Sequence, residues 1–438
     1  TLLSLSIVYA QSPSVKKIQS KDINFTELVE ELNLVSAPIY KQALEYIRKE
    51  ELNKAIIALN EIISITPYDP RAYASLSLIY IKAKQFDDFL KILELAGRNQ
   101  TSYDLIFEKL AAFNLIKEDP QNINQKIFIA PFKNNKKAAI SFLFDDGRRS
   151  VYTHALPLFD KYNLKATILI NPKTTPPEPT SQFDGSWTEW RDATKRGHEI
   201  GNHGYSHFDL TKLSEDDLEK EVNVSFSTIT EKLGRPPISF AFPFDKFNTK
   251  TLAKVLERHI AVRVHDYLTQ HYENIFIPSY GGKEFSTDTA QKFVEMAMIK
   301  KLWLVAECHE IQIDNIKSYK PMTSDFLETH LAYLKENENN LWIDTFSNIF
   351  IYLAQRKAAS LTIKEETANT MTFSLKTTIA PKVPQIPLTI VINTAPTMPN
   401  AVKATIKETG QLLETRIKDG QILLNTPPQK EDILVEWN

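Results

Sequence analysis

The sequence predicts an α/β fold for the central part of the chain, a distorted (β/α) barrel of about seven strands. Between residues 130 and 359, short apolar runs alternate with stretches of helical spacing. Residues 24–120 have helical patterning, and residues 360–438 form short β-type runs separated by Pro and Asn. We therefore expect an N-terminal α-helical repeat region, a central barrel and a C-terminal β-sandwich.

Size and composition agree with such a division. A chain of 438 residues is long enough for two or three domains, and 42% hydrophobic with 24% charged residues is typical of a globular protein. The net charge of −2 predicts no nucleic-acid partner and no attraction to an anionic membrane. Cys308 is the only cysteine, which excludes an intrachain disulfide and a cysteine-rich zinc site.

The first ten residues are apolar and uncharged and are followed by Gln11, Ser12 and Pro13. This pattern is typical of the end of a secretory signal peptide, so we interpret residues 1–23 as a signal-peptide remnant and linker. A frayed first helix or strand is the alternative. No other stretch has the roughly 18 uninterrupted apolar residues of a membrane span. We expect an exported protein, periplasmic or at the cell surface.

The helical region repeats its apolar positions about every 34 residues, which is the spacing of tetratricopeptide repeats. The matching pairs are Leu44 and Leu78, Tyr46 and Tyr80, Ile47 and Ile81, Leu52 and Phe86, and Leu59 and Leu93. Residues 24–120 are therefore expected to be a tetratricopeptide-like domain. It would either dock a protein partner or cap the neighbouring domain.

The elements of the barrel follow from hydrophobic periodicity. Strands are expected at the β-rich apolar run 138–144 and at 165–170, 199–202, 238–242, 260–264, 275–277, 302–306 and 341–344. Helices are expected at 151–162, 214–233, 287–300, 323–335 and 346–357. Ser214 and Asp217 form a capping-box start for the second of these helices.

Two further regions have alternative interpretations. The Pro-rich loop 171–190 contains Phe183, Trp187 and Trp190, which would suit a sugar-stacking rim, or else the tryptophans pack against the following helix. The C-terminal sandwich would either bind carbohydrate or only stabilise the protein. Its strands are expected at 361–364, 371–375, 388–392, 401–406, 422–424 and 433–437.

Acidic residues and histidines follow two of the expected barrel strands, where such barrels carry their chemistry. Asp146, His203 and His207 would give a divalent metal three ligands and leave a position open for water and substrate. Asp145 is then placed to take a proton from that water. Two imidazoles and one carboxylate favour zinc and also suit cobalt or nickel.

Two motifs carry a resemblance to a known family. The first is Phe144-Asp145-Asp146-Gly147. The second is His203-x-x-x-His207, which follows Arg196-Gly197-His198-Glu199-Ile200-Gly201-Asn202. On these motifs residues 137–357 resemble the polysaccharide deacetylases, the NodB-homology domain of carbohydrate esterase family 4. The resemblance implies that the first Asp of the pair is the base and that the second Asp and both motif histidines bind the metal.

The remaining motifs depart from the family pattern. Residues 241–245 (AFPFD) lack the arginine that many members have there, and Arg263 fits a branch whose arginine lies about twenty residues later. The backbone N–H of Phe244 would be the oxyanion donor. His309 would be the general acid, and Asp266 is the suggested residue that orients it. The other histidines singled out are interpreted as structural: His154, His259, His265, His271 and His330.

The sequence therefore predicts a metal-dependent deacetylase that removes N-acetyl groups from an amino-sugar polysaccharide, using a metal-activated water, an Asp base and a His acid. One alternative is an O-acetyl esterase acting on xylan or a similar glycan. A second is a glycan-binding protein with a degenerate catalytic site.

Overall fold

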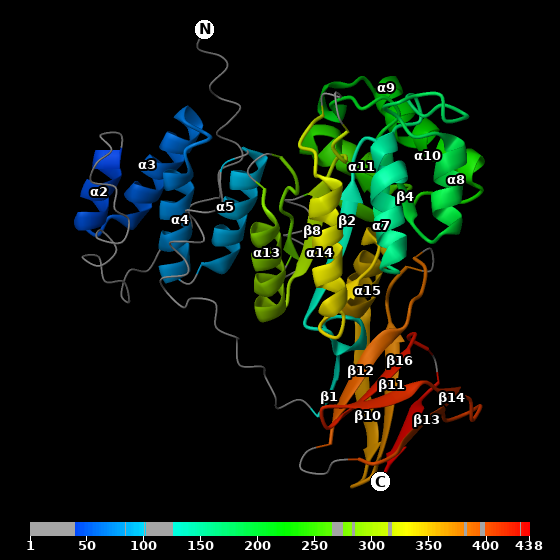
Figure 1. Ribbon diagram of the computed structural model, residues 1–438. Coiled ribbons are helices and arrows are strands. Elements are labelled where there is room, and N and C mark those ends of the chain that lie inside the picture. Colours follow the sequence, from blue (N-terminus) through cyan, green and yellow to red (C-terminus); the bar gives the residue numbers. More distant parts are fainter. Residues whose placement is uncertain are drawn as a thin grey trace. The chain divides into compact units, whose positions relative to one another are not determined.

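The chain forms two compact units in the computed structural model (Figure 1). One comprises Thr1–Lys117 with Phe276–Lys292, and the other Glu118–Ile275 with Phe293–Asn438. The predicted segment 1–23 lies outside the described residues, and the predicted domain boundaries stay predictions. The structure describes residues 40–83, 85–99, 101, 126–264, 275–282, 285–313, 318–380, 383–394, 399–429 and 431–438.

Helices make up the described N-terminal part of the first unit, as predicted: α2 (Lys41–Arg48), α3 (Leu52–Ile65), α4 (Pro70–Lys82) and α5 (Phe86–Arg98). Helix α4 begins where Asp69 accepts a hydrogen bond from the Arg71 N–H and Pro70 occupies the first turn. The tetratricopeptide-like repeat itself stays a prediction. Within the described residues, no helix combines the length and hydropathy of a membrane span.

A parallel sheet dominates the second unit, in the order β6-β5-β4-β3-β2-β8-β7, with β9 paired to β2. All seven residues of β2 are buried, as expected for a parallel strand covered on both faces. The predicted fold class is confirmed. The strands are β2 (Ala138–Phe144), β3 (Thr167–Ile170), β4 (Glu199–Asn202), β5 (Ser239–Ala241), β6 (Ala261–Arg263), β7 (Ile275–Phe276), β8 (Trp303–Cys308) and β9 (Leu341–Ile343).

Helices connect these strands, as the βα alternation requires. Ser214 caps α9 by accepting from the Asp217 N–H at 3.2 Å, as its capping-box position predicts. Helix α15 packs against β2, and α8 and α10 pack against β4. The helices are α7 (Leu156–Lys161), α8 (Trp187–Lys195), α9 (Glu215–Glu219), α10 (Ser225–Leu233), α11 (Thr249–Leu256), α13 (Thr287–Lys300), α14 (Ser324–Glu336) and α15 (Phe346–Ala358), with single π turns at Val151–Ala155 and Lys220–Val224.

The interpretation that Trp187 and Trp190 belong to a sugar-stacking rim is wrong. Ser186 and Glu189 form a capping box that starts α8, which makes Trp187 the first residue of this helix. Trp187 is 5% exposed and Trp190 is fully buried, so neither ring is available to stack on a sugar. The alternative interpretation, packing at the start of the helix, is confirmed. Phe183 remains exposed.

The C-terminal region is a sandwich of two antiparallel sheets, as predicted, in the orders β1-β12-β16-β15 and β10-β11-β17-β13-β14. Apolar side chains from both sheets share one buried core. The sequence did not predict β1 (Ile127–Ile129), which precedes the barrel and pairs with β12. The other strands are β10 (Ala359–Glu366), β11 (Thr370–Thr377), β12 (Leu388–Asn393), β13 (Val402–Ile406), β14 (Leu412–Leu413), β15 (Thr415–Lys418), β16 (Gln421–Thr426) and β17 (Ile433–Trp437).

Three histidines of the second unit are buried and are not among the predicted site residues: His198, His259 and His330. Burial lowers the pKa of His198 to about 4, and the pKa values of His259 and His330 to about 3. His259 and His330 therefore pack as neutral core residues, as predicted. His154 is exposed, and His265 and His271 lie outside the described residues.

The buried histidines predict a pH-dependent stability of the second unit. An unfolded imidazole binds a proton below pH 6.5, whereas folded His330 does not until about pH 3, so the free energy of unfolding falls as the pH drops through this interval. His330→Leu should reduce the slope by up to about 1.4 kcal/mol per pH unit. Denaturation followed by tryptophan fluorescence measures this unit alone, because its sequence contains every tryptophan.

The matched control is Phe326→Leu, which removes the ring stacked on His330 at a centroid distance of 5.9 Å and keeps the titrating imidazole. Its slope should equal that of the wild type. A His330→Leu slope indistinguishable from the wild type would contradict the prediction.

Candidate active site

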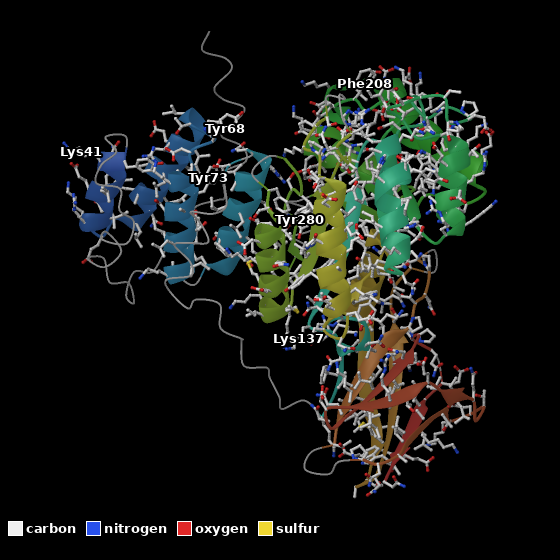
Figure 2. The ribbon with its side chains drawn as sticks, in the orientation of Figure 1. Lys41, Tyr68, Tyr73, Lys137, Phe208 and Tyr280 are labelled. Atoms are coloured by element: carbon white, nitrogen blue, oxygen red, sulfur yellow. The ribbon has the colours of Figure 1, made fainter. Side chains whose placement is uncertain are left out.

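The predicted site residues meet at the carboxyl-terminal edge of the parallel sheet. Asp145 and Asp146 follow β2, His203 follows β4, Arg263 ends β6, and His309 follows β8. The carboxyl ends of parallel strands lie at the same edge, so residues far apart in sequence come together there. Phe208, one residue after His207, lies at this end of the barrel, and Lys137, which precedes β2, lies at the other (Figure 2).

The three predicted metal ligands converge. Asp146 Oδ1 lies 3.2 Å from His207 Nε2 and 3.7 Å from His203 Nε2, and one ligand atom from each residue lies within 4.8 Å of the others. Ligand atoms placed tetrahedrally at zinc–nitrogen and zinc–oxygen bond lengths are about 3.3–3.6 Å apart. The donor set therefore fits a divalent metal, with only small adjustments of the side chains.

Hydrogen bonds hold His203 in the tautomer that a metal requires. Its Nδ1 lies 2.9 Å from the carbonyl oxygen of Ala241, and a carbonyl only accepts, so Nδ1 carries the proton and Nε2 keeps a free lone pair. Asn171 donates to the carbonyl of His203 at 2.6 Å and to that of Gly204. Between His203 and His207, the Ser206 N–H donates to the buried Glu221 carboxylate at 2.9 Å.

The backbone at the site is strained. Asp146, His207 and Phe244 have φ values of 69°, 60° and 59°, in the left-handed region that non-glycine residues rarely occupy. Each costs on the order of 1 kcal/mol or more, and such conformations persist where the surrounding structure enforces them. Two of the three are predicted metal ligands, which indicates that the fold fixes the direction of these side chains.

Asp145 and Arg263 form a buried ion pair. Arg263 donates two parallel hydrogen bonds to the Asp145 carboxylate, at 2.9 and 2.7 Å, and both side chains are at most 5% exposed. Burial alone would raise the pKa of Asp145, but the charge and hydrogen bonds of Arg263, together with the nearby His203 and His309, outweigh it and lower the pKa to about 2. Arg263 therefore helps to keep Asp145 ionised and holds its carboxylate in one orientation. Its predicted catalytic role stays a prediction.

Phe244 lies directly beside the metal ligands. Its ring contacts that of His207 edge to face, with centroids 4.6 Å apart, and its side chain is 60% exposed. The side chain of Phe244 therefore lies beside one of the predicted metal ligands, and the role of its backbone N–H stays a prediction.

His309 lies near Asp145, together with a carboxylate that the sequence analysis did not assign. One ligand atom from each of Asp145, Glu307 and His309 lies within 4.8 Å of the others. Among the described residues, none forms a hydrogen bond with the buried Nδ1 atom of His309, and the ring of Tyr319 packs edge to face on the imidazole at 4.8 Å. Asp266, the residue suggested to orient His309, lies outside the described residues.

Residues 132–261 match the family model of the polysaccharide deacetylases. The predicted resemblance to the polysaccharide deacetylases is thereby confirmed for this part of the chain. The chain is 26% identical over 133 residues to the uncharacterized protein YlxY of Bacillus subtilis (strain 168), covering 29% of this chain and 38% of that protein. It is 28% identical over 104 residues to a bifunctional xylanase/deacetylase of Pseudobutyrivibrio xylanivorans, covering 22% of this chain and 16% of that protein.

Solved structures are also similar to this part of the chain. A family 4 acetyl xylan esterase from Clostridium thermocellum, in complex with a cobalt ion, is 19% identical, with a TM-score of 0.33. The match covers 48% of this chain and 90% of that chain. By contrast, the chain spans well under half the length of the two curated relatives.

Several residues of the candidate site carry no sequence signal of their own. Arg148 lies 3.6 Å from Asp146 Oδ2 and 3.3 Å from Asp184 Oδ1, so it contacts a predicted metal ligand from the side. Asn171 contacts the backbone at His203, and Glu307 lies close to Asp145 and His309, through neighbours that only the fold supplies. The strand ends locate the ligands, whereas the residues that orient them depend on tertiary contacts.

Proposed function

We propose that the protein is a metal-dependent polysaccharide deacetylase that removes N-acetyl groups from an amino-sugar glycan. The observation that carries the proposal is the convergence of Asp146, His203 and His207 beside the ionised Asp145–Arg263 pair. A divalent cation held by these three residues would act as a Lewis acid towards the acetyl carbonyl and lower the pKa of a water molecule.

The protein residues have separate roles in this proposal. Asp145 accepts a proton from the attacking water, since its pKa keeps it ionised at neutral pH. The Phe244 N–H donates to the carbonyl oxygen as negative charge develops on it. His309 gives a proton to the leaving nitrogen, which would otherwise depart as an unstable amide anion.

The O-acetyl ester is the second candidate substrate. One matched relative is a bifunctional xylanase/deacetylase. The groups that would hydrolyse an amide would also hydrolyse an ester, since the alcohol of an ester is a better leaving group than an amine. Both reactions need the same base, donor and acid. The site residues alone therefore do not choose between the two bonds.

Acetate release from a panel of acetylated glycans tests the proposal. The full chain, loaded in turn with zinc, cobalt and nickel, is incubated with chitin oligomers, peptidoglycan and acetylated xylan. We expect release from the amino-sugar polymers and its loss on chelation. Release from xylan alone would replace the proposal by the esterase, and metal binding without release from any substrate would replace it by a glycan-binding function.

Glu307 is expected to position His309. The Glu307 carboxylate lies close to the His309 imidazole and can hold its orientation, so Glu307→Gln should reduce kcat about tenfold. The measurement is the separate determination of kcat and KM, of which only kcat should fall. Glu310→Gln, at the neighbouring carboxylate, is the control. A Glu307→Gln variant that raised KM and kept the wild-type kcat would contradict the positioning role.

A further inference from the structure

A second concave site lies at the amino-terminal edge of the barrel. It is a groove of about 1140 Å³ between the starts of β2 and β9 and the C-terminal sheets. Its wall includes β1, the beginning of β10 and the turn between β15 and β16. We call it the basic groove, after the cations that line it: Lys126, Lys136, Lys137, Lys301, Arg356 and Lys418.

The charge of the groove is strongly one-sided. Among the described residues that line it, Asp419 is the only acidic one. Lys126 forms an ion pair with Glu366, but Lys136 and Arg356 donate to the carbonyl oxygens of Glu338 and Ile129, which do not neutralise their charge. On a chain whose net charge is −2, such a concentration creates a local field that attracts anions.

The cations also crowd one another. Burial lowers the pKa of the Lys136 ammonium, and the positive charges of Lys418 and Arg416 lower it further, against a smaller opposite effect of the Glu338 carboxylate. An anion bound between these cations would relieve their repulsion.

Amide side chains join the cations along the groove. Asn135 donates to Gln421 at 3.0 Å, and Gln421 donates to Asn393 at 2.8 Å, which forms a chain of amides across β12 and β16. Asn339 and Asn340 line the same groove. Amides pair with hydroxyl groups as donors and as acceptors, which suits a sugar as well as its charged substituent.

The basic groove is separate from the candidate active site. Lys137 and Asp145 flank the two ends of β2, and eight residue steps of about 3.3 Å place them about 26 Å apart. Figure 2 shows Lys137 at the end of the barrel that adjoins the C-terminal sheets, opposite Phe208. A ligand in the groove therefore does not touch the catalytic residues.

We propose that the basic groove is a non-catalytic binding site for an anionic polysaccharide, held by its carboxylate or phosphate groups against the lysines and by its hydroxyls against the amides. The choice of a glycan over other polyanions rests on the proposed deacetylase function. The groove would keep the enzyme on an acidic polymer while the active site works on acetylated sugars.

The test measures binding of the full chain to soluble polygalacturonate, with neutral dextran and a single-stranded DNA oligonucleotide of equal charge as comparisons. Polygalacturonate carries no N-acetyl group, so the result is independent of the catalytic proposal. Binding is expected at about 20 mM NaCl and should weaken strongly at about 200 mM NaCl, as screening of exposed charges requires. Dextran should not bind.

The variant is the double substitution Lys136→Gln and Lys418→Gln, and the matched control is Lys195→Gln with Lys232→Gln, two exposed lysines on α8 and α10. The groove variant should bind polygalacturonate about tenfold more weakly than the control, because it removes two of the cations that face the anionic groups. Unchanged tryptophan fluorescence shows that both variants are folded. Acetate release from a short neutral substrate should equal that of the wild type.

Three results would overturn the proposal. Equal binding by the groove variant and the control would remove the groove as the site. Tighter binding of the oligonucleotide than of polygalacturonate would make the ligand a nucleic acid. No binding of polygalacturonate at low salt would show that the basic groove does not bind an anionic polysaccharide.

Discussion

Replacing Asp145 with asparagine should reduce acetate release by about 10²–10⁴-fold, the range that a positioned general base contributes. Asparagine keeps the size of the side chain and can still meet Arg263, but its amide cannot accept the proton of the attacking water. Metal binding should persist, because Asp146, His203 and His207 are untouched. The measurements are acetate release and metal content of the same preparation.

The matched control for this variant is Asp160→Asn. Asp160 is also paired with an arginine, Arg196, but lies away from the candidate active site and is partly exposed. Acetate release by the control should equal that of the wild type. If Asp145→Asn retained its metal and more than a tenth of wild-type activity, another group would be the base.

The barrel was predictable because its signals are local. A buried parallel strand such as β2 is a continuous apolar run, and the helices between strands have apolar residues at helical spacing. β1 was missed because three residues carry no periodic pattern, and its pairing with β12 joins Ile127 to Ile392 across most of the chain. Helix α8 did leave a local signal, the Ser186–Glu189 capping box, behind a proline-rich run that suggested a loop.

The site was predictable as far as it depends on strand ends. Asp145 and Asp146 follow the apolar run 138–144, His203 follows the short strand 199–202, and the parallel sheet brings those strand ends together. Glu307 was not assigned because the strand was expected to end at residue 306, two residues before the observed end of β8, and its closeness to Asp145 depends on the register of β8 beside β2. The basic groove was likewise hidden, since its lysines come from distant segments of a chain with almost no net charge.

Replacing Arg263 with methionine should destabilise the second unit by about 3–5 kcal/mol, because it leaves the buried Asp145 carboxylate without its partner. The pKa of Asp145 in the folded protein lies below its ordinary value of 3.8, so the pair stabilises the protein above about pH 4, and this contribution is lost as the pH falls through about 2. Without Arg263, burial raises that pKa instead. The deficit should therefore be largest near neutral pH and shrink on acidification.

The double variant Asp145→Asn with Arg263→Met separates the contribution of the ion pair to stability from its contribution to acetate release. With the charge and its partner both removed, no buried ion remains unpaired, so most of the lost stability should return, while acetate release stays absent. Arg196→Met, which breaks the partly exposed pair with Asp160, is the control and should cost about 1 kcal/mol or less. Denaturation followed by tryptophan fluorescence measures all of these variants. A double variant no more stable than Arg263→Met would show that the guanidinium stabilises the fold by packing, and not by neutralising the catalytic carboxylate.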